Sequence, residues 1–175
     1  MHLQSGDIVL RNAVEKDFPQ LCAWWNDGAV MAHAGFPNGL GITVEEIAKK
    51  ISTDSDDTRR RLVMEYRGIL IGEMSFRNHN DGSASIGIDI CRTEYQNKGF
   101  GRIILSLLIR ELFARGYAKI VLDTNLNNLR AQHFYELLGF RKLRVNIDSW
   151  KDQLGNPQSS VDYELYPEDF HDYSI

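Results

Sequence analysis

The segment Gln96-Asn97-Lys98-Gly99-Phe100-Gly101-Arg102 decides the fold class, because the sequence pattern changes its period across it. Upstream, residues 83–90 alternate apolar side chains with small or polar ones, the period of a half-buried strand. Downstream of Gly99, apolar residues recur at spacings of three and four, which predicts an amphipathic helix ending near Gly116. The glycines therefore stand at a junction from strand to helix.

Weaker signals on both sides predict the remaining elements. Strands are expected at residues 8–11, 62–66, 69–76, 119–124, 140–147 and 161–166, and helices at 15–30, 44–51 and 128–138. Arg67-Gly68 and Asn80-Asp81-Gly82 are turn signals that make the middle strands an antiparallel meander. Residues 148–160 are expected to form a hairpin loop. The order βααβββαβαββ predicts an α/β (α+β) fold with a mixed, mostly antiparallel central sheet flanked by helices.

Composition limits the class of protein. A chain of 175 residues with 43% hydrophobic and 25% charged residues fits one domain over residues 1–175, with 168–175 expected as a solvated C-terminal tail. The longest apolar run, Ile103 to Ile109, is far shorter than the roughly 20 residues of a membrane span. The start MHLQSGDIVL lacks the features of a secretion signal, so a cytoplasmic location is expected. A net charge of −4 argues against a nucleic-acid partner.

The junction itself has the chemistry of an anion site. The first N–H groups of a helix have no intrahelical partner, and the helix dipole adds positive charge there. Lys98 and Arg102 add formal charge. A Walker loop and a dinucleotide fingerprint are both excluded, because the required lysine-serine pair and third glycine are missing, with Ile at position 104. The histidines and the two cysteines show no spacing typical of a metal site, so no metal is expected.

Two motifs in order resemble the GNAT superfamily of N-acetyltransferases. The pattern Gln-x-x-Gly-x-Gly at 96–101 resembles that family's acetyl-CoA pyrophosphate loop. About thirty residues later, 128–140 resembles its Asn-x-x-Ala-x-x-x-Tyr-x-x-x-Gly-Phe segment. The likeness extends over residues 8–166 in the order of elements and over 86–140 in motif detail. Thr93 departs from the proline common in related loops, and we expect only a softer exit from the strand.

The resemblance implies a cofactor site with named residues. The backbone of Ile90 and Cys91 would pair with the pantetheine amides, and the N–H groups from Gln96 to Arg102 would hold the pyrophosphate. Asn128 would hydrogen-bond the pantetheine arm. Tyr135 would lie near the thioester sulfur. Acetyl-CoA is thus the expected co-substrate.

Acetyl transfer to an amine requires a base and an acid. A primary alkylammonium, with a pKa of about 10.4, must lose a proton before it attacks, and the departing thiolate gains one. Tyr135, a neutral phenol at pH 7, suits the acid role. Asp89 is the preferred base, because the strand alternation directs it away from the aliphatic face; Glu73 or a chain of water molecules are the alternatives. Direct transfer does not require Cys91 as a nucleophile.

The acceptor is less defined than the cofactor. The first helix and the loop after it, which cover the acceptor in the resembling fold, contain Trp24, Trp25, Asp27 and Phe36. Aromatic faces and carboxylates suit a small cationic amine, similar to a polyamine or an aminoglycoside. An N-terminal protein or peptide acetyltransferase and a non-catalytic CoA-binding module remain as alternatives. A homodimer formed through an edge strand of the 140–166 hairpin is a further possibility.

Overall fold

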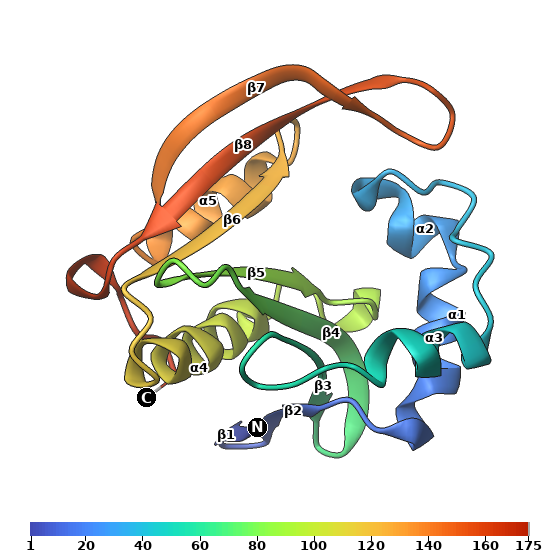
Figure 1. The fold of residues 1–175 in the computed structure, drawn as a ribbon, viewed down its shortest axis with the longest axis horizontal. Helices are drawn as coiled ribbons and strands as arrows, with labels where there is room; N and C mark the ends of the chain where they lie inside the picture. The colour runs from blue at the N-terminus through green and yellow to red at the C-terminus, as the bar shows by residue number, and fades with distance from the viewer. Residues whose placement is uncertain (175) are drawn as a thin grey trace.

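The computed structural model describes residues 1–174, and its eight strands form one sheet in the order β1-β2-β3-β4-β5-β6-β8-β7 (Figure 1). The strands are β1 His2–Ser5, β2 Ile8–Asn12, β3 Arg59–Tyr66, β4 Ile69–Asn78, β5 Ser83–Asp89, β6 Lys119–Asn125, β7 Arg141–Lys151 and β8 Pro157–Leu165. The α-helices are α1 Phe18–Trp25, α2 Gly28–Met31, α3 Val44–Ile51, α4 Phe100–Ala114 and α5 Leu129–Leu137. Short 3₁₀ turns η1 to η4 lie at Glu15–Asp17, Ala32–Ala34, Thr93–Tyr95 and Pro167–Asp169. The predicted mixed, mostly antiparallel sheet with flanking helices is confirmed.

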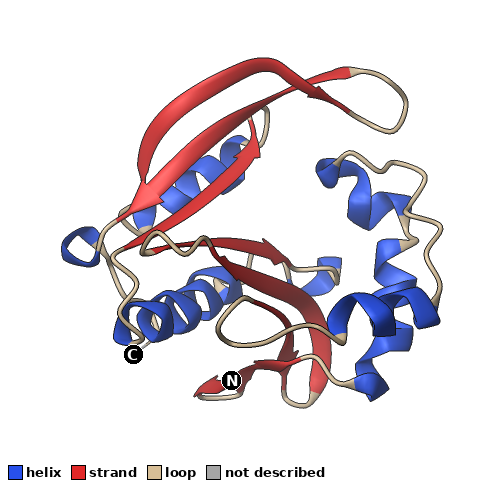
Figure 2. Ribbon diagram, in the orientation of Figure 1, coloured by secondary structure: helices blue, strands red, loops and turns tan. Residues whose placement is uncertain are grey.

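The sheet splits in its middle. All neighbouring strands are antiparallel except β5 and β6, which are parallel and pair only from Ser83–Lys119 to Ser85–Val121. Beyond these pairs β5 continues to Asp89 beside β4 alone, and β6 continues to Asn125 beside β8 alone. The two halves of the sheet diverge from this point, as Figure 2 shows, and we call the opening the split. Backbone groups on its two edges have no partner across it.

Two hydrophobic clusters pack helices against the two faces of the sheet. The larger one packs α4 and α5 against the sheet, with Leu62, Met64, Phe76, Leu108 and Tyr163 among its fully enclosed side chains. The smaller one packs α1 and α3 against the opposite face of β3, around Leu21, Ile47 and Val63. Adjacent strand residues thus serve different clusters, as the alternation of a strand buried on both faces requires.

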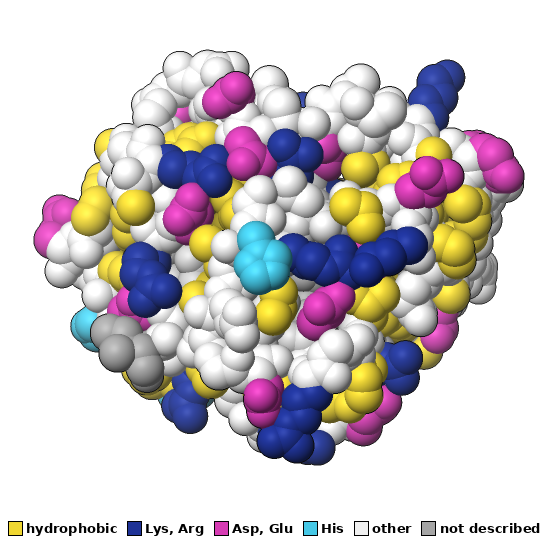
Figure 3. Space-filling view, turned by 90° about the horizontal axis from the view of Figure 1, so that it is seen from below, with side chains coloured by type: hydrophobic (Ala, Val, Ile, Leu, Met, Phe, Trp, Pro, Cys, Tyr) yellow, Lys and Arg dark blue, Asp and Glu magenta, His cyan; other side chains and the backbone are white. Residues whose placement is uncertain are grey.

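At the edge of the sheet, the sequence predicted β2 as residues 8–11 but did not predict β1. The edge is a hairpin in which β1 pairs with β2. Basic and acidic side chains alternate on the face seen in Figure 3, and ion pairs such as Arg11–Asp17 and Arg67–Asp7 lie near this end. Charged residues at a sheet edge discourage pairing with another chain.

The predicted first helix, residues 15–30, is wrong as a single element. It is divided into η1, α1 and α2, because Asn26 leaves the helix and exchanges side-chain bonds with the backbone of Ile42. Gly28 lies against the Pro37 carbonyl, where a Cβ would collide. Asp27 then caps α2 by accepting from the Ala29 N–H. Tertiary contacts override helix propensity at this position.

Two further expectations for the C-terminal part are corrected. Residues 148–160 are mostly strand, because Asp152 accepts from the N–H groups of Leu154 and Asn156 and makes the turn short. Residues 168–174 are not a solvated tail. The Tyr173 N–H donates to the Ser106 hydroxyl, and Ser174 is buried beside Ser5. In residues 1–174, no helix is both long enough and apolar enough to cross a membrane.

Candidate active site

Three ionisable groups gather where the sheet splits. Asp89 ends β5 on one side, Asp123 lies in β6 on the other, and Tyr135 projects from α5. Burial, together with the charges of Asp123 and Asp89, raises the pKa of Tyr135 to about 12, so both carboxylates act on the phenol. Burial, with the nearby Asp162, also raises the pKa of Asp123. The split therefore joins a phenol and two carboxylates.

The position of Tyr135 is set by the helix that carries it. Asn128 caps α5 by accepting from the Ala131 N–H, so its amide oxygen is engaged within the helix start. The Tyr135 ring packs edge-on against Phe134 and Phe140, and only 8% of the residue is exposed. Its hydroxyl has no hydrogen-bond partner in the described part of the chain, yet it is not fully enclosed. A neutral phenol with a free O–H is available to donate a proton.

The surroundings of Asp89 bring the pKa of its carboxyl group closer to neutral pH. Its pKa is raised to about 6, mainly by burial; the neighbouring Glu73 contributes to the rise, and the imidazole of His33 opposes it. His33 Nε2 lies 3.5 Å from Asp89 Oδ2, and its Nδ1 donates to the Val30 carbonyl at 2.8 Å. A carboxylate with such a pKa accepts protons from an amine more readily than a solvated one.

Glu73 does not fit the alternative base role. It is the cross-strand partner of Asp89, but both its oxygens are engaged. The Trp25 indole N–H donates to Oε1 at 2.6 Å, and the Arg61 guanidinium pairs with Oε2 at 2.7 Å. Only 7% of Glu73 is exposed. The structure thus assigns Glu73 to holding α1 against the sheet.

The residues expected to meet the acceptor occupy less accessible positions than the sequence suggests. Trp24 and Trp25 are each 6% exposed within the smaller cluster, so their rings are not free for stacking. The Asp27 carboxylate is engaged as a helix cap. Phe36 remains 37% exposed in the loop after η2.

That loop is tied to the hairpin turn between β7 and β8, across the mouth of the split (Figure 1). The Gln153 N–H donates to the Gly35 carbonyl at 2.7 Å, and its side chain bonds the backbone of Asn38 and Gly39. The Trp150 ring lies against Gly35, which leaves no room for a Cβ. Chain segments far apart in sequence thereby meet at the loop that carries Phe36 and follows His33, and both residues stay exposed there.

The glycine-rich loop presents an array of free donors. Gly99 has a φ of +79° and Asn97 a φ of +60°, the left-handed conformation that glycine and asparagine tolerate best. Among residues 1–174, the N–H groups from Asn97 to Arg102 donate to no protein acceptor. Gly101 is buried, and a Cβ there would lie 3.0 Å from the Phe134 ring. This is the arrangement that binds phosphate at a helix start.

Gln96 differs from the other expected loop ligands. Its N–H donates to the Thr93 carbonyl, so it is not available to a pyrophosphate. Its side-chain amide donates to the Ile90 carbonyl at 2.8 Å and ties the loop to the end of β5. The Lys98 ammonium lies 5.6 Å from the Tyr95 ring and the Arg102 guanidinium 5.4 Å from the Tyr173 ring, so aromatic rings position both charges.

Cys91 is not suited to nucleophilic attack. Burial raises the pKa of its thiol well above the usual range, and Asp89 adds to this effect. A thiol that stays protonated is a poor nucleophile. The described residues contain no group of three side chains that could hold a metal ion.

His33 and Asp123 were missed by sequence reasoning. Asp123 had a signal: it follows Ile120 and Leu122 on a short strand and lies on the opposite face from them. His33 had none, because an isolated histidine in a loop shows no pattern that points to Asp89.

Comparison with known proteins shows the family and the shared fold. A family model described as "Acetyltransferase (GNAT) domain" matches residues 7–141. The spermidine N-acetyltransferase of Vibrio cholerae, in complex with CoA and spermine, superposes with a TM-score of 0.81 at 24% identity, covering 93% of this chain and 97% of that one. A ribosomal-protein-alanine N-acetyltransferase of Brucella melitensis gives a TM-score of 0.76 at 20% identity, over 90% and 98%. At such identity these two show the shared fold.

Curated relatives match over shorter segments. The ribosomal protein bS18-alanine N-acetyltransferase of Escherichia coli K12 is 40% identical over 52 residues, which is 30% of this chain and 35% of that protein. The Haemophilus ducreyi protein of the same name is 28% identical over 72 residues, 41% of this chain and 50% of that protein. The matches thus span half or less of the length of these curated relatives. Since the family model covers most of the sequence, including the strand, loop and helix that build the split, the chain belongs to the GNAT acetyltransferase family.

Proposed function

We propose that the protein transfers an acetyl group from acetyl-CoA directly to a primary amine within the split. The observation that carries the proposal is the meeting of free loop N–H groups, an unpaired strand edge and a neutral phenol around one opening. CoA in the related Vibrio cholerae structure supports it. The test is release of free CoA thiol from acetyl-CoA that depends on an added amine.

The cofactor would use the loop and the edge of β5. The N–H groups from Asn97 to Arg102 would bind the pyrophosphate, with charge from Lys98 and Arg102. The pantetheine arm would extend along Ile90 and Cys91, where β5 has left β6. Asn128, at the start of α5, would bond the arm with the amide N–H₂ that its capping role does not use. This path ends at Tyr135.

The proposed chemistry uses an ionised Asp89 carboxylate, which accepts a proton, and a neutral Tyr135 phenol, which donates one. Asp89 accepts a proton from the ammonium, either directly or through water, and the free amine attacks the thioester carbonyl. The tetrahedral intermediate collapses with cleavage of the C–S bond, and the Tyr135 hydroxyl protonates the leaving thiolate. The second proton of the attacking nitrogen then passes to the Tyr135 phenolate, directly or through water, which leaves a neutral amide and restores the phenol. His33, in contact with Asp89, gives the accepted proton a route towards solvent.

The acceptor's reacting end is cationic before transfer, and Asp89 and Asp123 draw it into the split. Asp89 and Asp123 support the sequence-based prediction of a small cationic amine only for the reacting ammonium group of the acceptor. Glu73 is neutralised by Arg61, and Asp27 is engaged in a cap. The spermine in the Vibrio cholerae neighbour supports a small amine as the acceptor.

Acetylation of a protein N-terminus is the second candidate, because proteins named for that activity are among the relatives. A panel of polyamines, aminoglycosides, amino acids and N-terminal peptides separates the two candidates by the acceptor that gives thiol release. Lack of amine-dependent release with every member would favour a non-catalytic CoA-binding module.

The pH profile should identify the base. With a pKa of about 6, Asp89 is protonated below that pH, and we expect kcat/KM to fall about tenfold per pH unit there. Asp89→Asn should lower kcat/KM at pH 8 and abolish this inflection. Glu73→Gln is the matched control and should keep the inflection even if stability drops. If both variants retain the wild-type profile, a water relay replaces Asp89 as the base.

We also propose that the edge strand β7 pairs two copies of the chain. Leu143, Val145 and Ile147 in β7 are 58%, 44% and 66% exposed. Exposed edges with apolar side chains favour association. Light scattering at micromolar concentration should give twice the monomer mass for the wild type and the monomer mass for Val145→Lys. A monomeric wild type would contradict the proposal.

A further inference from the structure

The sheet face that carries Asp89 continues into a basic area along β3, β4 and β5. Cross-strand register places Val63, Glu73 and Asp89 in one row. The next row along the strands contains Arg61, Ser75 and Gly87, and the following one Arg59, Arg77 and Ser85. Alternate residues of a strand share a face and lie about 7 Å apart. The last row is therefore about 14 Å from that of Asp89.

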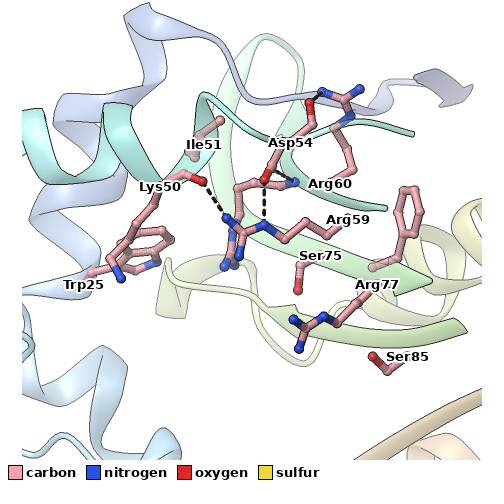
Figure 4. A pocket seen from close by; sticks show the side chains of 11 residues that line it. Trp25, Lys50, Ile51, Asp54, Arg59, Arg60, Ser75, Arg77 and Ser85 are labelled. Carbon is pink, nitrogen blue, oxygen red and sulfur yellow. Dashed lines mark hydrogen bonds and ion pairs between the residues drawn. The ribbon is translucent and has the colours of Figure 1, made fainter. Parts of the chain in front are cut away.

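A pocket of about 360 Å³ lies over these two basic rows (Figure 4). Trp25 and the end of α3, with Lys50 and Ile51, line it on one side, and Ser75 and Ser85 lie on the strands. A second hollow of about 310 Å³ shares Arg59 and Arg77 with it and extends towards Asn78. Figure 4 shows Arg59, Arg77 and Ser75 directed into the same space.

The positive charge of this pocket is only partly balanced. Arg61 is paired with Glu73, and Arg59 with Asp54. Arg77 and Lys50 form no ion pair within residues 1–174, and both are exposed. Arg59 and Arg77 are direct cross-strand partners. Like charges directly opposite each other destabilise a sheet, and the ion pair with Asp54 offsets this at Arg59 but not at Arg77.

We propose that this pocket binds an anionic group of the acceptor, a carboxylate or a phosphate, while the acceptor's amine reacts beside Asp89. The guanidinium of Arg77, the Lys50 ammonium and the Ser75 and Ser85 hydroxyls are the groups that would bind it. The row of Ser75, about 7 Å from Asp89, matches the separation of an amine and an anion at opposite ends of a small molecule such as lysine. This inference rests on the proposed function: it keeps a small primary amine as the acceptor and adds to it an acidic group, as in an amino acid or a short peptide.

Matched acceptors test it. Lysine and cadaverine differ by one carboxylate, as do ornithine and putrescine, and phosphoethanolamine differs from ethanolamine by its phosphate. At saturating acetyl-CoA, we expect kcat/KM to favour the anionic member of at least one pair by about tenfold or more, typical of a charge-assisted bond. The carboxylate and phosphate pairs tell which anion the pocket takes.

Arg77→Gln should bring that ratio close to one, mainly through KM, with the Kd for CoA unchanged. Arg67→Gln, an exposed arginine at the β3–β4 turn, is the control and should keep the wild-type ratio. Ratios near one in the wild type, or a ratio unaffected by Arg77→Gln, would overturn the inference while leaving amine acetylation intact. Absence of turnover with every amine would instead overturn the proposed function.

Discussion

Tyr135→Phe should lower kcat by roughly 10²-fold and leave the Kd for CoA nearly unchanged, as expected when a general acid is removed. The Tyr135 hydroxyl makes no hydrogen bond in residues 1–174, so its loss breaks no contact of the fold. The ring, which is the packed part, remains in place among Phe134 and Phe140. Burial holds the pKa at about 12, so the wild-type phenol keeps its proton throughout the working range.

Tyr163→Phe is the matched control. The Tyr163 ring lies 5.9 Å from that of Tyr135, but its hydroxyl donates to Glu136 instead of facing the split. This variant should keep turnover within about threefold of wild type, because it loses one part-buried hydrogen bond worth about 1 kcal/mol of stability. If Tyr135→Phe turns over as fast as wild type, Tyr135 has no part in the proton transfer.

Gly101→Glu should abolish detectable CoA binding, a loss of at least about 10²-fold in Kd. A Cβ at this position already meets the Phe134 ring at 3.0 Å, so the longer side chain must turn towards the loop. There its carboxylate would face the free N–H groups and repel the pyrophosphate. Titration calorimetry with CoA measures the effect, and circular dichroism checks that the variant is folded.

Ala114→Glu adds the same charge to the exposed far end of α4 and should bind CoA as wild type does. A Gly101→Glu protein that is folded and retains wild-type affinity would show that the cofactor lies elsewhere.

The elements that the sequence predicts well are those whose signals are local. The alternation in 83–90 and the helical period after Gly99 both persist in the structure, as β5 and α4. The capping box at Thr43 opens α3 as its spacing requires. The same local signals predict the glycine-rich loop and α5. The donors from Asn97 to Arg102 and the position of Tyr135 in its helix could therefore be predicted.

Features that depend on contacts between residues far apart in the sequence could not be predicted. The break at Asn26 is made by bonds to Ile42, sixteen residues away. The turn at Asp152 was missed for another reason: its side-chain bonds to Leu154 and Asn156 are local, but hydrophobic periodicity does not show them. The pairing of Glu73 with Arg61 and Trp25 needs three elements to meet. The sequence therefore does not show that Glu73, one of the carboxylates expected near the acceptor, is already paired with Arg61 in the fold.

Direct acetyl transfer is tested by mixing the wild-type protein with acetyl-CoA and the amine panel, and by following both free thiol and the mass of the amine. We expect that thiol release depends on an amine, that the amine gains the mass of one acetyl group, and that Tyr135→Phe slows both by the same factor. Thiol release without amine acetylation, or no release with any amine while CoA binds, would contradict direct acetyl transfer.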